Sequence, residues 1–176
     1  MTETAGSWRT RLAHPFPTSN DTIADRLVRV VVRRRARVIA EELLKQHVVF
    51  GARDRVHIAS SAVVNNAVFN SVSGHITIGE WAMVAHGVYL ATGQHEIAKL
   101  GAERQAAVPN VGRDIVVEEG AWLATNVIVL GPCRIGRHAV VAAGSLVRSD
   151  VPAHAVFAGV PARQVAIVPG AATFDT

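Results

Sequence analysis

Eight histidines and one cysteine are the side chains of this sequence best suited to proton transfer, nucleophilic attack or metal binding. Imidazole, with an ordinary pKa of about 6.5, takes up and returns a proton at neutral pH. Cys133 is the single cysteine, so the chain forms no internal disulfide and offers no metal site built from several thiolates. The chemistry therefore depends on which histidine the fold brings to a site. The histidines are His14, His47, His57, His75, His86, His95, His138 and His154.

A second concentration of charge is a run of arginines near the N-terminus. Residues 26–37 hold six arginines and no acidic residue: Arg26, Arg29, Arg33, Arg34, Arg35 and Arg37. Without them the 18 basic residues fall to 12 against 14 acidic ones, so the net charge of +4 becomes −2. The basicity is therefore a local patch and not a property of the whole chain. We expect no nucleic acid partner.

The segment that carries these arginines is predicted to be an amphipathic helix from about residue 23 to residue 46. Asn20, Asp21 and Thr22 provide N-capping side chains before it. We expect the arginine face to be solvated, with the helix packed on the body of the protein or on a neighbouring subunit. The alternative is peripheral contact with an anionic membrane or polymer. The apolar stripe consists of Ile23, Leu27, Val30, Val31, Val38, Leu43 and Leu44.

Composition limits the kind of core that the rest of the chain can build. Hydrophobic residues make up 49% of the 176 residues but aromatic ones only 5%, so the core must consist of Val, Ile, Leu and Ala. This suits one domain with a narrow interior. No apolar segment is long enough to span a membrane, and residues 1–20 lack the apolar stretch of a signal peptide. We expect a cytoplasmic protein.

From Val56 onward, aliphatic residues recur every six positions. Six residues fit neither a helix nor a simple strand, but they fit a triangular coil with three hexads per turn, each hexad forming a short strand and a corner. The aliphatic residue points inward, and the small residue after it is predicted to make the corner. Successive turns stack on one another. The aliphatic residues are Ile58 and Val64; Ile78, Val84 and Leu90; and Val117, Leu123, Val129, Ile135, Val141 and Val147.

Two breaks interrupt this register. The spacing from Val64 to Ile78 is 14 residues, which predicts a two-residue bulge, and the spacing from Leu90 to Val117 is 27. Residues 94–114 must therefore leave the coil as a protruding loop, and long excursions of this kind are commonly functional. We divide the chain into an arm and basic helix (1–55), the coil (56–168) and a tail (169–176).

Over residues 63–165 the chain resembles the hexapeptide-repeat acyltransferases of the galactoside and maltose O-acetyltransferase type. The resemblance rests on TGQHE at 92–96, VEEGAWLATNVIVLG at 117–131, IGRHAVVAAGSLV at 135–147 and DVPAHAVFAGVPAR at 150–163. It implies a mainly β fold, a left-handed parallel β-helix. It also implies a homotrimer with active sites between subunits, and a loop that reaches onto a neighbour.

The resemblance assigns catalytic roles to three residues. His95, after the Thr-Gly at the root of the loop, is the general base. Asn65, or the adjacent Asn66, contacts the acceptor. Glu96 could orient the second ring nitrogen of His95, and a backbone carbonyl could do the same.

The resemblance also assigns a coenzyme site, with acetyl-CoA or another acyl-CoA as co-substrate and no metal. Trp122 lies beside the pantetheine arm, and the backbone N–H of Thr125 faces the developing oxyanion. Arg148 and Arg163 meet the phosphates. The small residues Ala143, Gly144 and Ser145 present backbone groups to the pantetheine.

These roles imply transfer of an acyl group, most simply acetyl, to a hydroxyl of a sugar or saccharide-containing acceptor. The N-terminal segment does not resemble that type, so the acceptor cannot be carried over, and N-acetylation of an amino sugar stays open. The alternatives from other classes are a γ-carbonic-anhydrase-like zinc enzyme and a non-catalytic β-helix assembly module. The zinc enzyme needs three histidines with two of them five residues apart, and no two histidines here have that spacing.

Overall fold

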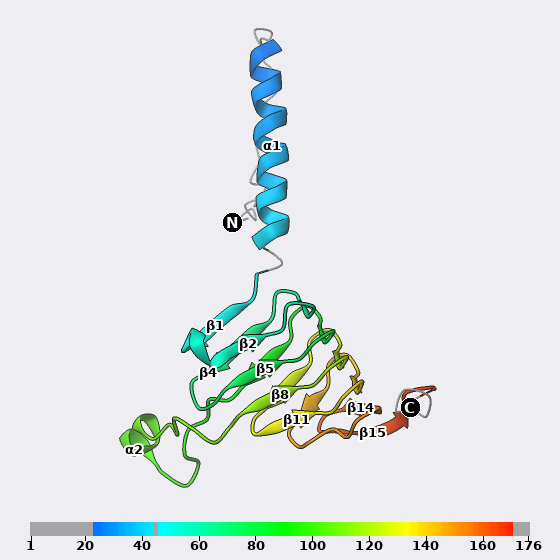
Figure 1. Cartoon of the computed structure of the whole chain (residues 1–176). Coiled ribbons are helices and arrows are strands. Elements are labelled where there is room, and N and C mark those ends of the chain that lie inside the picture. Colours follow the sequence, from blue (N-terminus) through cyan, green and yellow to red (C-terminus); the bar gives the residue numbers. More distant parts are fainter. Residues whose placement is uncertain (1–22, 44–45, 171–176) are drawn as a thin grey trace, which may run out of the picture. The chain divides into compact units, whose positions relative to one another are not determined.

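The computed structural model describes residues 23–43 and 46–170, which divide near residue 40 into two compact units. Helix α1, Ile23–Leu43, dominates the first unit, and the second is a coil of short strands (Figure 1). Among the described side chains of α1, both arginines and aliphatic residues are exposed. No helix in these ranges is long and apolar enough to cross a membrane.

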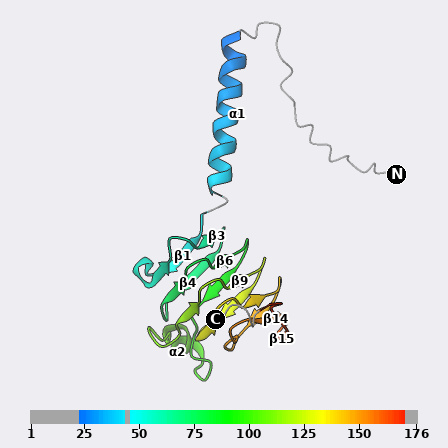
Figure 2. The same cartoon turned by 45° about the vertical axis from the view of Figure 1, so that its right-hand side comes forward.

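The coil is a parallel β-helix built from three sheets, here named sheets A, B and C. Each turn adds one strand to each sheet in the order A, B, C, and each strand pairs in parallel with the strand one turn away (Figures 1 and 2). The fold class predicted from the six-residue period is confirmed. Sheet A contains β1 (Val48–Gly51), β4 (Val68–Ser71), β7 (Tyr89–Ala91), β10 (Ile128–Leu130) and β13 (Leu146–Val147). Sheet B contains β2 (Val56–Ile58), β5 (Ile76–Ile78), β8 (Ile115–Val117) and β11 (Cys133–Ile135). Sheet C contains β3 (Val63–Val64), β6 (Met83–Val84), β9 (Trp122–Leu123), β12 (Val140–Val141), β14 (Ala155–Gly159) and β15 (Ala162–Ile167).

The core of the coil is a stack of aliphatic side chains from all three sheets. The hexad residues from Ile78 to Val147 are at most 1% exposed. Ile58 and Val64 are only partly buried because they belong to the first turn, which has a neighbour on one side only. The coil begins before the six-residue register does, since β1 pairs with β4 from Val48 to Gly51.

The corners differ from the prediction in one respect. The left-handed backbone does not fall on the small residue after each aliphatic residue but two residues further on, at Trp81, Gly87, Gly120, Asn126, His138, Gly144 and His154. The small residue has another purpose: a Cβ added to Gly79 would lie 2.9 Å from the Glu119 nitrogen on the next turn. Close stacking of the turns, and not backbone strain, therefore requires a small residue there.

The predicted loop leaves the coil after β7 and returns at β8. It carries a short helix, α2 (Gly101–Ala106), which the sequence did not reveal. At the other end of the molecule, β15 runs antiparallel to β14 and closes the last turn. A short 3₁₀ turn, η1 (Arg53–Arg55), joins β1 to β2. The extra residues between Val64 and Ile78 lie after β4, where Val72 to His75 lead into β5.

Candidate functional site

The root of the loop is tied together by hydrogen bonds from both of its ends. Thr92 is buried, and its hydroxyl donates to the Asn70 carbonyl at 2.7 Å. Arg113, at the returning end, donates from Nε to the Thr92 carbonyl at 2.8 Å and from Nη2 to the Gly131 carbonyl. One guanidinium thus joins the outgoing strand end, the returning strand and the next turn.

His95 lies three residues beyond this root and is oriented by the loop itself. Its Nδ1 lies 2.9 Å from the Arg104 carbonyl in α2. A carbonyl only accepts hydrogen bonds, so Nδ1 must carry the proton in this contact. In the neutral ring, Nε2 then keeps its lone pair and can act as a base.

Arg104 also holds the loop in shape through its side chain. Its guanidinium donates to the carbonyls of Lys99 at 2.5 Å and of Ile97 at 3.0 Å. Its carbonyl, and not the Glu96 carboxylate, lies at Nδ1 of His95. Sequence reasoning missed Arg104 and Arg113, because both bind backbone carbonyls, which leave no mark in a sequence pattern.

His95 is exposed and borders two hollows beside the loop. One, of about 370 Å³, is lined further by Gly101, Arg104 and Gln105. The other, of about 200 Å³, has Asn70 and Gln94 among its lining residues. The ring therefore faces space large enough for a small acceptor group.

A second group of candidates lies along the corner that joins sheet C to sheet A. Asn65 follows β3, and its Nδ2 donates to the Val84 carbonyl at 3.2 Å. The adjacent Asn66 instead accepts the Gly87 N–H at 3.1 Å. Two turns from Asn66, the Thr125 carbonyl accepts the Gly144 N–H at 2.9 Å. Within the described part of the chain no acceptor takes the Thr125 N–H, so this exposed donor is available to a ligand.

The small residues of this corner divide into two kinds. Ala143 and Gly144 are exposed, and a Cβ added at Gly144 would meet no atom within 4 Å. Ser145 is only 1% exposed, and its Oγ accepts the Gly159 N–H at 3.1 Å. Ala143 and Gly144 thus offer open backbone to a ligand, whereas the Ser145 side chain supports the turn.

Trp122 points outward from sheet C and is 44% exposed. Its register partners are Met83 on one side and Val140 on the other. With Val63, which pairs with Met83, these side chains form an apolar column up the outer face of sheet C. Figure 2 shows the strands of sheet C that carry this column, β3, β6 and β9.

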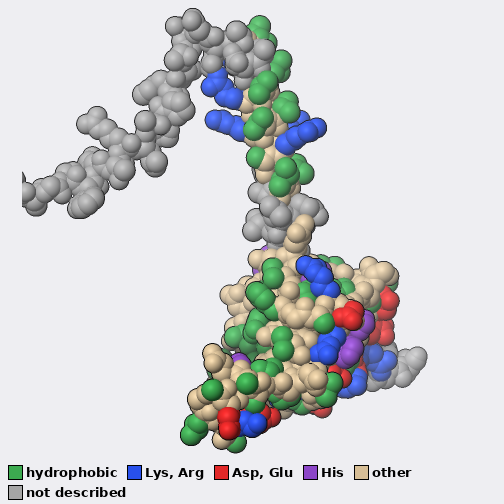
Figure 3. All heavy atoms as spheres, turned by 90° about the vertical axis from the view of Figure 1, so that its left-hand side faces the viewer, with side chains coloured by type: hydrophobic (Ala, Val, Ile, Leu, Met, Phe, Trp, Pro, Cys, Tyr) green, Lys and Arg blue, Asp and Glu red, His purple; other side chains and the backbone are tan. Residues whose placement is uncertain are grey.

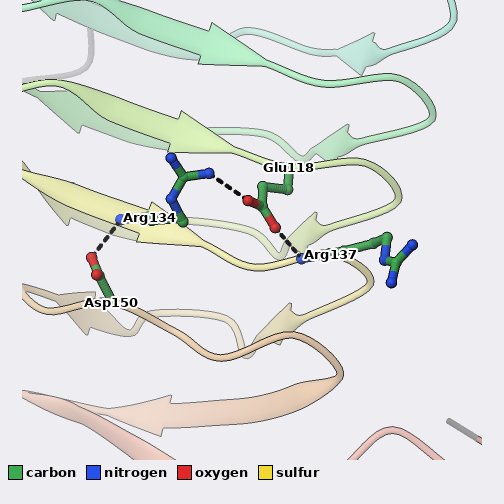
Figure 4. Close-up of polar contacts among 4 residues, drawn as sticks. All are labelled: Glu118, Arg134, Arg137 and Asp150. Atoms are coloured by element: carbon green, nitrogen blue, oxygen red, sulfur yellow. Dashed lines mark hydrogen bonds and ion pairs between the residues drawn. The ribbon is translucent and has the colours of Figure 1, made fainter. Parts of the chain in front are cut away.

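The outer face of sheet B is polar by contrast. Arg134 forms an ion pair with Glu118 one turn away, and the other carboxylate oxygen of Glu118 accepts the Arg137 N–H at 2.8 Å. Asp150 accepts the Arg134 N–H at 2.8 Å (Figure 4). These side chains tie neighbouring turns together on a face that suits water.

Arg148 and Arg163 are brought together at the C-terminal end of the coil. Both line a hollow of about 650 Å³ that also contains Phe157 and Gln164. Arg148 in addition borders a smaller hollow with Gln94 and Arg113 at the loop root. Basic side chains thus extend from the loop root to the end of the coil.

One chain does not bring all the candidates together. His95 follows a strand of sheet A, whereas Asn65 and Thr125 precede strands of that sheet. The strands between these corners, β4, β7 and β10, have three or four residues each, so a span of roughly 10 Å or more separates the two corners at about 3.3 Å per residue. Within one chain, His95 therefore does not lie next to Asn65 or Thr125.

Cys133 is not a nucleophile at neutral pH. The thiol is buried and donates to the Ser149 carbonyl at 3.2 Å. Burial, with a smaller contribution from Asp150, raises its pKa from 9.0 to about 12. The described residues also contain no cluster of three or more His, Cys, Asp or Glu side chains that could hold a metal ion.

Comparison with known proteins agrees with the geometry of the coil. Residues 114–149 match the bacterial transferase hexapeptide (six repeats) family. Serine acetyltransferase 2 of Arabidopsis thaliana is 35% identical over 113 residues, which cover 64% of this chain and 33% of that protein. The galactoside O-acetyltransferase of Lactococcus lactis subsp. lactis (strain IL1403) is 31% identical over 112 residues, 64% of this chain and 52% of that protein. The chain thus spans about half or less of these two relatives.

A solved galactoside acetyltransferase in complex with coenzyme A superposes on the coil with a TM-score of 0.59 and 25% identity. The match covers 69% of this chain and 59% of that one. The repeat and the three stacked sheets agree with this likeness. Residues 114–149 thus carry the bacterial transferase hexapeptide repeat, and the chain as a whole resembles galactoside O-acetyltransferases.

Proposed function

We propose that this protein is a CoA-dependent acyltransferase that transfers an acyl group, most simply acetyl, to an acceptor hydroxyl, with His95 as general base. The observation that carries the proposal is the 2.9 Å contact between His95 Nδ1 and the Arg104 carbonyl. That contact fixes the tautomer in which Nε2 is free to accept a proton. A histidine held in this way at a loop root is what deprotonation of a weakly acidic hydroxyl requires.

In the proposed reaction the acyl-CoA supplies the thioester whose carbonyl carbon is attacked. His95 Nε2 takes the proton of the acceptor hydroxyl as its oxygen attacks, and returns it to the departing sulfur. The imidazolium is stabilised meanwhile because Nδ1–H remains bonded to the Arg104 carbonyl. The unused N–H of Thr125 is suited to the negative charge that develops on the thioester oxygen.

Three features of the chain support a coenzyme site. Arg148 and Arg163 line one hollow, where guanidinium groups can pair with phosphates. Ala143 and Gly144 expose backbone that a pantetheine arm can approach closely. Trp122 offers an exposed indole beside that path. The solved relative that resembles the chain was obtained with coenzyme A.

The site is completed, in our proposal, by trimerisation. The outer faces of sheets A and C carry exposed apolar side chains, among them Met83, Trp122 and Ile128, whereas sheet B is polar. Threefold closure buries two different faces of each chain against its neighbours. It would also bring the His95 loop of one chain towards the Asn65 corner of the next.

The acceptor class follows from the relatives and not from the geometry. We propose a sugar or saccharide-containing hydroxyl because one of the matched relatives is a galactoside O-acetyltransferase. The same base would serve an amine, so N-acetylation of an amino sugar is the second candidate. We propose that the protein acts in the cytoplasm, where acyl-CoA is available.

Mass spectrometry of the products tests the proposal. The protein is incubated with acetyl-CoA, longer acyl-CoAs and a panel of neutral and amino saccharides, with a His95→Ala variant as the matched control. We expect acetylated saccharide and free CoA with the parent only. Light scattering of the same sample should give three chains per particle, and a monomer that remains fully active would contradict the shared site.

A further inference from the structure

Helix α1 exposes far more apolar surface than a solvated helix needs. Its eight largest described aliphatic side chains are between 53% and 80% exposed. Figure 3 shows hydrophobic and basic side chains along the helix. Contiguous exposed apolar surface of this kind marks an interaction site. The side chains are Ile23, Leu27, Val28, Val30, Val31, Val32, Val38 and Ile39.

Three arginines and two apolar rows lie on different sides of α1. Arg26, Arg29 and Arg33 follow one another at steps of three and four residues, which places them on one side. Two adjoining apolar rows lie on the other side, because their members are spaced by four and seven residues. The rows are Leu27, Val31 and Val38, and Val28, Val32 and Ile39.

We propose that α1 lies flat on an anionic phospholipid bilayer and anchors this protein to the membrane surface. Guanidinium groups pair with lipid phosphates, and the apolar rows enter the boundary between head groups and acyl chains. Charge complementarity carries the choice of partner: residues 26–37 hold six arginines and no acid, whereas the remainder of the chain has a net charge of −2. The body therefore gives no comparable attraction to such a surface.

A second copy of α1 is a poorer partner than the bilayer. Each apolar row is interrupted by an arginine, Arg34 in one and Arg35 in the other, and these line a hollow of about 410 Å³ with Val31, Val38 and Ile39. Helices paired along either row would bury these like charges against each other. On a bilayer the long stems of Arg34 and Arg35 can lie along the apolar surface while their charged ends reach the phosphates.

An anionic polymer is also a poorer partner, because it would neutralise the arginines and leave the apolar rows in water. The two partners therefore predict different responses to substitution. A polymer needs only the basic side of α1, whereas a bilayer needs both sides. The test must change each side separately.

Vesicle flotation with the full chain makes this test. Vesicles of phosphatidylcholine with about a third phosphatidylglycerol should carry the parent upward at low salt. Pure phosphatidylcholine vesicles should not, because binding requires attraction to anionic lipid in addition to apolar insertion. The variant Arg26→Gln/Arg29→Gln/Arg33→Gln should bind about a hundredfold more weakly, at roughly a factor of five per basic residue. The matched control Arg53→Gln/Arg134→Gln/Arg137→Gln removes the same charge from the coil and should float like the parent.

A second variant tests the apolar side at constant charge. Leu27→Ser/Val31→Ser/Val38→Ser should lose flotation while it still binds a soluble polyanion, and an unchanged melting temperature shows that the coil is folded. Three results would overturn the proposal: a parent that does not float, flotation that survives the arginine substitutions, or flotation that survives the serine substitutions. The result does not depend on the proposed acyltransferase activity, since transfer to a soluble saccharide is measured separately without vesicles.

Discussion

The two corners at the ends of sheet A position their candidate site residues in different ways. At the corner from sheet C, the chain always turns within a few residues, and Asn65 and Thr125 are placed by the repeat itself through rung-to-rung hydrogen bonds. At the corner to sheet B, the chain can leave the coil for more than twenty residues, and His95 is placed by two arginines. In our proposal, the regularly repeated corner binds the long coenzyme, whereas the hydrogen bonds of Arg104 and Arg113 hold the single reactive ring of His95.

The substitution His95→Ala tests most directly whether the loop corner supplies the general base. We expect turnover to fall by about two to four orders of magnitude, the usual effect of removing a positioned general base. Affinity for acyl-CoA should change little because the proposed base contacts the acceptor more than the coenzyme. Steady-state kinetics and acyl-CoA titration measure the two effects, with His57→Ala on the outer face of sheet B as the control. Retention of more than about a tenth of the activity would show that His95 is not the base.

Leu123→Ala tests how much the aliphatic stack inside the coil contributes to stability. Leu123 is fully buried in the middle of the stack, so its truncation should lower the free energy of unfolding by about 2–5 kcal/mol. Chemical denaturation measures the loss, and Leu100→Ala in the exposed loop is the matched control, with a much smaller expected effect. Equal losses at the two sites would mean that the loop is as tightly packed as the coil.

Arg113→Met tests whether the hydrogen bonds at the loop root position His95 independently of the stability of the coil. Without its hydrogen bonds to Thr92 and Gly131, the loop root should loosen, and kcat should fall by about tenfold as His95 loses its fixed position. Trypsin should then cut more rapidly at Lys99 or Arg104, while the coil stays intact. A fall in kcat with no change in the rate of cleavage would place the effect of Arg113 elsewhere.

Alkylation of Cys133 is the smallest of these expected effects, and it measures whether the interior of the coil is closed to reagents. Its pKa of about 12 means that iodoacetamide at pH 8 should leave the native protein unmodified and react once it is denatured. The unfolded thiol ionises near pH 9.0, whereas the folded one keeps its proton until about pH 12. This contribution to stability is therefore present below pH 9 and is lost as the pH rises towards 12. Rapid labelling of the native protein would show that the turn is open.

The sequence predicts those features that repeat. The hexads from Ile78 to Val147 predicted which side chains are buried, since period and burial have the same geometric cause. The predicted corner position was wrong by two residues: the left-handed region falls at residues such as Trp81 and His138, whose N–H groups donate to Ser61 and Glu119 on the preceding turn. Arg104 and Arg113 could not be recognised, since their partners are carbonyls whose approach depends on the folded loop.

The reversed last strand has a consequence for how such a coil ends. A stack of parallel turns presents at each end a row of unpaired backbone groups that a second molecule can extend, as in a growing fibril. On sheet C, β15 turns back along β14, so the edge that this sheet leaves at that end runs against the direction that another parallel turn would need. The final hairpin thereby disfavours the addition of another parallel turn to sheet C at the C-terminal end of the coil.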